Sequence, residues 1–77
     1  MILKKGDRVL GFDDFDHPFL VPDIFCSINN RFANRYVCFK GNYKYCIPYN
    51  GNEHLELKRA PKEILENARK DWLNNNK

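Results

Sequence analysis

No apolar run in the sequence approaches the length of a membrane-spanning helix, which needs about 20 residues. The first five residues include two lysines and lack the long apolar segment of a secretory signal peptide. We therefore expect no contact with a membrane and a cytoplasmic location. At 77 residues, the chain is long enough for one domain, which we expect to span residues 1–77.

Paired cysteine motifs are also missing. Cys26, Cys38 and Cys46 are an odd number and show none of the C-x-x-C spacing of zinc sites. The two histidines, His17 and His54, add no metal-binding pattern. A cysteine nucleophile would need a general base beside it in a cleft, and the sequence does not indicate such an arrangement. The sequence thus predicts reduced, buried thiols in a reducing compartment, with no metal, no cofactor and no enzymatic activity.

Acidic residues are absent from one central segment. Residues 31–47 have no acid, whereas residues 1–30 carry five acids against three bases. The formal net charge of the whole chain is only +3, so the central segment is the basic part of the molecule. Its bases are Arg31, Arg35, Lys40 and Lys44.

A β-hairpin is predicted over residues 35–47. Two runs rich in Tyr, Val, Phe and Ile flank Gly41-Asn42, a dipeptide that can adopt the positive φ angles of a two-residue turn. With this turn, Val37 faces Cys46 across the hairpin. Cys38 and Cys46 then point to opposite faces of the sheet, so no disulfide can join them.

Three further strands are expected outside the hairpin. The first covers residues 8–12 and the second covers residues 19–28, where Pro22 requires an edge or a bulge. Residues 54–57 form either a brief fifth strand or a single helical turn. Period-two alternation in the second strand predicts three inward side chains, those of Ile24, Cys26 and Ile28.

A helix is predicted over residues 61–73. Pro61 suits the first helical position, and Glu63 lies near the positive end of the helix dipole. Five short strands and a terminal helix predict a mainly β fold, a small five-stranded barrel over residues 4–57 with the helix packed on it. The expected apolar face of the helix consists of Ile64, Leu65, Ala68 and Trp72.

Three short motifs follow one another along the chain. Residues 5–10 read Lys-Gly-Asp-Arg-Val-Leu, residues 18–24 read Pro-Phe-Leu-Val-Pro-Asp-Ile, and residues 36–41 read Tyr-Val-Cys-Phe-Lys-Gly. Their order resembles that of the SH3-like barrels of the Tudor and PWWP type, although the second motif is offset by one residue. The terminal helix is similar to the helical extension of the PWWP group.

This resemblance implies an aromatic cage. Tudor and PWWP domains bind methylated lysine or arginine between aromatic rings, often with acidic residues beside them, and many also contact nucleic acid. Carried over to this chain, the cage would consist of Phe12, Phe19, Phe39 and Tyr43, with Asp13 or Asp14 nearby.

Two binding functions follow from these patterns. In the first, the basic hairpin contacts DNA or RNA in a regulatory or accessory role, with cations on phosphates and a tyrosine stacked on a base. The alternative is a protein-binding module, either a cage reader or a small bacterial or phage effector that inhibits a larger host protein. Aromatic rings also fill small cores, and lysines also protect strand edges. The expected nucleic-acid contacts are Arg31, Arg35, Lys40, Lys44, Tyr43 and Tyr45.

Overall fold

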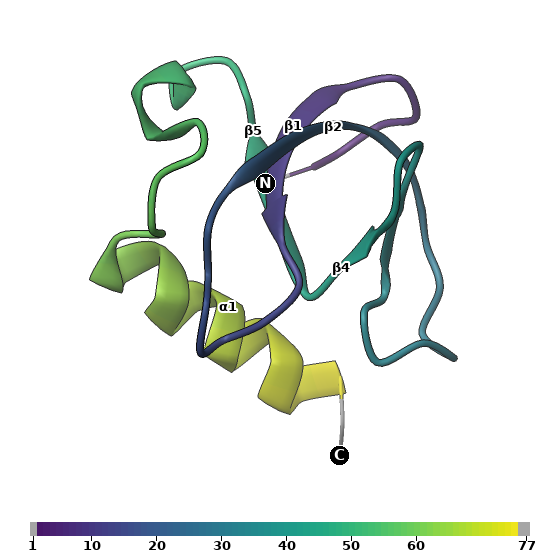
Figure 1. The fold of residues 1–77 in the computed structure, drawn as a ribbon. Helices are drawn as coiled ribbons and strands as arrows, with labels where there is room; N and C mark the ends of the chain where they lie inside the picture. Colours follow the sequence, from purple (N-terminus) through teal and green to yellow (C-terminus); the bar gives the residue numbers. More distant parts are fainter. Residues whose placement is uncertain (1, 76–77) are drawn as a thin grey trace.

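The computed structural model describes residues 2–75 as one antiparallel sheet and a C-terminal α-helix (Figure 1). The strands are β1 (Arg8–Phe12), β2 (Val21–Ile28), β3 (Tyr36–Cys38), β4 (Asn42–Tyr43) and β5 (Tyr45–Pro48). A short 3₁₀ helix, η1 (Glu53–Leu55), precedes α1 (Lys62–Asn75). The strand order is β4-β3-β2-β1-β5. The predicted mainly β class with five strands and one C-terminal helix is confirmed.

The sheet is strongly curled because its two edge strands are neighbours in the chain. β4 and β5 lie at opposite ends of the strand order, yet only Lys44 separates them. The N–H of Lys44 donates to the carbonyl oxygen of Phe12 at 2.8 Å, which fixes this junction beside the end of β1. No strand pairing joins β4 to β5 within residues 2–75. The curl thus brings the edges together without a closing ladder.

Two apolar clusters lie on the two faces of β1 and β5. Alternation along β1 sends Val9 into the curl and sends Leu10 and Phe12 toward α1. The inner cluster consists of Val9, Phe25, Tyr36, Cys38, Tyr43 and Cys46. The helix cluster consists of Leu10, Phe12, Leu20, Ile47, Ala60 and Ala68.

The helix packs on the sheet through the expected face. Ala68 is fully buried, Ile64 and Leu65 are half-buried against the helix cluster, and Trp72 is 36% exposed near the end of the helix. α1 begins one residue later and ends two residues later than predicted. No helix within residues 2–75 has the length and apolar character needed to cross a membrane.

The predicted turn at Gly41-Asn42 is wrong, because the chain reverses two residues earlier. β3 and β4 pair with Tyr36 opposite Tyr43, so the tip of the hairpin is Phe39-Lys40. The buried carboxylate of Asp23 on β2 accepts the N–H of Lys40 at 3.1 Å and holds this tip. β5 does not continue the hairpin and pairs with β1 instead.

The displaced turn also changes the placement of two cysteines. Cys38 and Cys46 lie together in the inner cluster, with their Sγ atoms 3.8 Å apart. The prediction that they point to opposite faces is therefore wrong. Both are free thiols, as is the half-buried Cys26.

The face that β2 buries is the opposite of the one predicted. Asp23 and Phe25 are buried, whereas Ile24 and Ile28 are 38% and 47% exposed and Cys26 is half-buried. The hydroxyl of Tyr43 donates to the Asp23 carboxylate at 2.7 Å, so a hydrogen-bonded acid occupies the inner face instead of an isoleucine.

Pro22 lies in an edge-like part of β2, as expected. It is opposite Leu10 on β1, while the pairing of β2 with β3 begins only at Phe25. Its missing N–H therefore costs no ladder hydrogen bond.

The fifth strand has a different origin from the one predicted. Residues 53–55 form η1, so a helical turn is correct for this region and the strand at residues 54–57 is wrong. Five strands arise because Lys44, at the junction, divides the expected second hairpin strand into β4 and β5.

Candidate functional site

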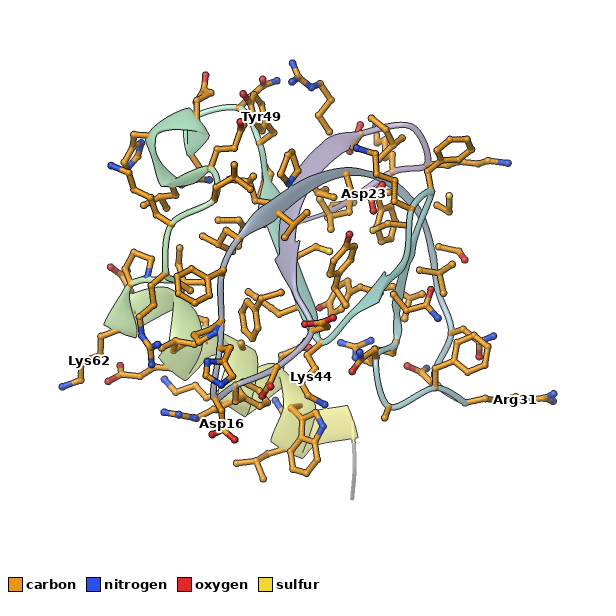
Figure 2. The ribbon with its side chains drawn as sticks, viewed as in Figure 1. Asp16, Asp23, Arg31, Lys44, Tyr49 and Lys62 are labelled. Atoms are coloured by element: carbon orange, nitrogen blue, oxygen red, sulfur yellow. The ribbon has the colours of Figure 1, made fainter. Side chains whose placement is uncertain are left out.

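The basic residues of the expected interface do not form one surface. Arg31 is exposed in the loop between β2 and β3, and Lys40 is exposed at the tip of the β3–β4 turn. Lys44 is half-buried at the junction of β4 and β5. Figure 2 shows Arg31 and Lys44 on separate parts of the molecule. The charge that is contiguous in the sequence is dispersed in the fold.

Arg35 is held by the helix. Its guanidinium lies 2.7 Å from the carboxylate of Asp71 on α1, and the two side chains are only 12% and 24% exposed. The hydroxyl of Tyr36 donates to the second oxygen of Asp71 at 3.1 Å, and the guanidinium lies 4.7 Å from the centre of the Tyr36 ring. Arg35 therefore joins the start of β3 to α1, and a phosphate contact would have to compete with this ion pair.

The two tyrosines of the expected interface belong to the interior to different degrees. Tyr43 is buried in the inner cluster, and its hydroxyl is occupied by Asp23. Tyr45 is half-buried, and its ring meets that of Tyr36 edge-on at 5.7 Å between centres. Tyr43 is therefore not placed to stack on a base.

The rings of the implied cage do not surround one cavity. Phe12 is buried in the helix cluster and Tyr43 in the inner cluster. Phe39 is 79% exposed at the β3–β4 tip, whereas Phe19 is exposed beside Arg59, with which it forms a backbone bridge. The two acids of the set, Asp13 and Asp14, lie in the loop that follows β1, where the first is exposed and the second half-buried.

Residues outside the implied cage form a groove of about 310 Å³ between the loop that follows β1, Lys44 and the end of α1. We call it the Phe15 groove. The Phe15 ring packs edge-on against Phe12, with 5.6 Å between ring centres, so the loop is anchored on the helix cluster. The helix residues have the i, i+3, i+4 spacing that places side chains on one face. The groove is lined by Phe15, Lys44, Arg69, Trp72 and Leu73.

Two cations lie near the Phe15 ring. Nζ of Lys44 is 5.9 Å and Cζ of Arg69 is 5.6 Å from the ring centre. Both distances are close to the limit of about 6 Å for cation–π attraction, so the contacts are weak and both charges can turn toward an anion. The nearest acid in sequence, Asp14 in the same loop, uses its carboxylate to accept the N–H of Asp16 at 2.8 Å. The groove thus combines an aromatic and apolar wall with two cations.

Of the expected site residues, only Lys44 lines the groove. The sequence did not indicate Phe15 or Arg69 as site residues. The remaining lining residues, Trp72 and Leu73, come from the end of the helix. An aromatic residue within the run of aspartates, and a tryptophan and a leucine among polar residues at the end of the helix, were the available sequence signals. Neither signal reveals that the two segments meet at Lys44.

A second surface is largely apolar, although Arg8 and Lys40 line the pocket beside Ile24. It lies on the outward face of β2, where Ile24 and Ile28 are exposed, and continues to Phe39, whose N–H donates to the carbonyl oxygen of Ile24. Exposed apolar patches of this kind are typical of interaction surfaces.

Comparison with protein-family models, curated proteins and solved structures gives no match. Within residues 2–75, no three metal-ligating side chains lie close enough together to hold an ion. The Phe15 groove is therefore the feature from which a function is inferred.

Proposed function

We propose that this chain binds single-stranded nucleic acid in the Phe15 groove. The observation that supports the proposal is the combination of two aromatic rings, Phe15 and Trp72, with two cations, Lys44 and Arg69, around one cavity. Single strands bind proteins through bases stacked on aromatic rings and phosphates against basic side chains. Each stacked base contributes about 1–3 kcal/mol.

The size and charge of the groove favour a single strand over a duplex. Bases in a duplex are already stacked on their neighbours, whereas an unpaired base can enter a cavity and stack on a side chain. Two cations give a small electrostatic contribution, and exposed Asp13 and Asp16 in the adjacent loop oppose a long phosphate track. We expect a short binding site with a weak salt dependence.

The curled sheet also supports a more specific fold. β5 returns to pair with β1 after a four-strand meander, so the two ends of the sheet are drawn together. We propose that this arrangement is an SH3-like barrel, in agreement with the motif order of the sequence. Such a small barrel would act by binding and not by catalysis, and its free thiols fit the reducing cytoplasm.

Trp72 is the only tryptophan in the chain, so its fluorescence reports directly on the groove. Titration with a single-stranded oligothymidine should quench this fluorescence. The logarithm of the affinity should fall with the logarithm of the salt concentration with a slope of about −1.4, since each phosphate contact to a single strand contributes about 0.7. Lys44→Gln and Arg69→Gln should each reduce the slope by about 0.7.

Lys62→Gln is the matched control, because Lys62 is an exposed base on the same helix and does not line the groove. It should leave quenching and salt slope nearly unchanged. Equal effects of all three variants would assign the binding to diffuse charge, and an affinity that ignores salt would eliminate phosphate contact.

A protein-binding function is the second candidate, favoured by the exposed apolar face of β2 at Ile24 and Ile28. The same titration separates the two candidates. If the tryptophan fluorescence does not respond to oligonucleotides even at low salt, binding of single-stranded nucleic acid is eliminated. Protein binding is then the remaining candidate function.

A further inference from the structure

The inner cluster contains two thiols in contact. The Sγ atoms of Cys38 and Cys46 are 3.8 Å apart, and the two residues are 6% and 0% exposed. Their strands are not neighbours in the sheet, since β2 and β1 lie between β3 and β5. The thiols therefore meet across the interior of the curl.

We infer that Cys38 and Cys46 form a dithiol that is converted to a disulfide by a low-molecular-weight disulfide of the glutathione class. The sulfur atoms must approach from 3.8 Å to about 2 Å, a movement that side-chain rotation and a small shift of the β3–β4 turn can supply. Cys26 is not part of the inner cluster, and its half-buried thiol faces the carbonyl oxygen of Ile24 at 4.0 Å.

Cys38 is the thiol that reacts first. Either thiol can donate in the contact between the two Sγ atoms, and this contact lowers the pKa of Cys38 and raises the pKa of Cys46. Cys38 is also the last residue of β3, directly before exposed Phe39, so opening of the turn brings it to solvent. The thiolate is the attacking form in thiol–disulfide exchange.

The reaction has two exchange steps. The Cys38 thiolate attacks one sulfur of the small disulfide, whose S–S bond breaks and releases one small thiolate that takes up a proton. Cys46 then loses its proton and attacks the Cys38 sulfur of the mixed disulfide, which displaces the second small thiol. In total, the protein dithiol loses two electrons and two protons, and one small disulfide becomes two small thiols.

The product would link β3 to β5 covalently through the interior of the sheet. This link joins strands on the two sides of the curl, whereas the hydrogen-bonded ladders run only between adjacent strands. We expect the oxidised protein to unfold at a higher urea concentration than the reduced protein, because the crosslink restricts the unfolded chain.

The test uses the full chain with Cys26→Ser, which leaves only the two thiols of interest. The folded protein is equilibrated with reduced and oxidised glutathione at a series of ratios, quenched with acid, unfolded and alkylated, and its intact mass is measured. We expect two alkylated thiols under reducing conditions and none under oxidising conditions, with no glutathione attached. Wild-type protein digested after oxidation should yield a peptide pair linked through Cys38 and Cys46.

Two controls make the result decisive. The same variant in urea confirms that the redox buffer oxidises an accessible dithiol, and Cys26→Ser with Cys38→Ser should never lose its remaining alkylation site to an internal bond. Three results would each overturn the inference. Both thiols could persist in the folded protein under oxidising conditions at equilibrium, the reaction could stop at a glutathione adduct, or the wild-type disulfide could include Cys26.

Discussion

At the scale of single residues, the position of Tyr43 depends on Asp23 and Gly11. The Tyr43 hydroxyl donates to the buried carboxylate of Asp23, and its ring lies directly over Gly11. A Cβ on Gly11 would lie 2.7 Å from Cγ of Tyr43 and 2.9 Å from Sγ of Cys46. Gly11 does not have a positive φ, so the position requires glycine for space and not for backbone conformation.

Gly11→Ala should lower the free energy of unfolding by about 1–3 kcal/mol, because a methyl group there forces Tyr43 or Cys46 to move. Gly41→Ala is the matched control: its Cβ would find only the Tyr43 hydroxyl, 3.9 Å away, and its φ is not positive. That change should stay within about 0.5 kcal/mol. Urea denaturation of both variants checks the expectation. A large cost at Gly41 would instead favour the turn at Gly41-Asn42.

At the scale of elements, α1 is attached to the rest of the protein at two places. Ala68, with its half-buried neighbours Ile64 and Leu65, packs on the helix cluster. One helical turn later, Asp71 receives the Arg35 guanidinium and the Tyr36 hydroxyl. The second attachment is polar and half-buried, and it joins α1 to Arg35 in the loop before β3 and to Tyr36 at the start of β3.

Asp71→Asn should destabilise the fold by about 1–3 kcal/mol, because it removes the charge that pairs with Arg35 and weakens the hydrogen bond from Tyr36. Lys70→Gln, at an exposed position next to it, should have little effect. Hydrogen exchange should show faster opening at the start of β3 in the first variant and not in the second. Identical exchange in the two variants would mean that the ion pair does not hold these elements together.

Local patterns predicted the elements of this fold better than their connections. β1 and α1 were found because a short apolar run and helical spacing are visible within a few residues. The β3–β4 turn was misplaced because its position depends on Asp23, an acceptor 17 residues before Lys40 in the sequence. The buried face of β2 was reversed for the same reason, since apolar alternation gave no indication that an aspartate would be drawn inward.

The candidate site was less predictable than the fold. Lys44 was named from the charge of residues 31–47, but its partners in the groove come from the loop after β1 and from α1. Their proximity depends on the hydrogen bond from Lys44 to Phe12 and on the packing of Phe15 against Phe12. Such contacts between distant segments have no signature in a single sequence.

At the scale of the whole molecule, buried phenols connect stability to alkaline pH. Burial raises the pKa of Tyr36, Tyr43 and Tyr45, with further increases from Asp71 at Tyr36 and from Asp23 at Tyr43. A group with a raised pKa in the folded state contributes its full stability below its unfolded pKa, which is about 10 for tyrosine. Above that pH the unfolded chain loses its protons first, so the free energy of unfolding falls as pH rises.

Tyr43→Phe should cost about 1–3 kcal/mol near pH 7, because Asp23 loses a hydrogen-bond donor. The difference between wild type and variant should then narrow above about pH 10, where wild type begins to lose the contribution of this phenol. Urea unfolding at a series of pH values measures both effects. A difference that stays constant across this range would show that Tyr43 has the same proton affinity in the folded and unfolded states.

Lys44 is a spacer of minimum length between the two ends of the sheet. A residue inserted beside Lys44 would let the two ends of the sheet separate and would move the Lys44 ammonium away from Phe15. Deletion of a residue there would shift the register of β5 against β1. Because side chains alternate along a strand, a slip of one residue would exchange the faces of Cys46 and Ile47. Changes in chain length should therefore be tolerated in the exposed loop segment at residues 30–33 and should destabilise the fold at this one position.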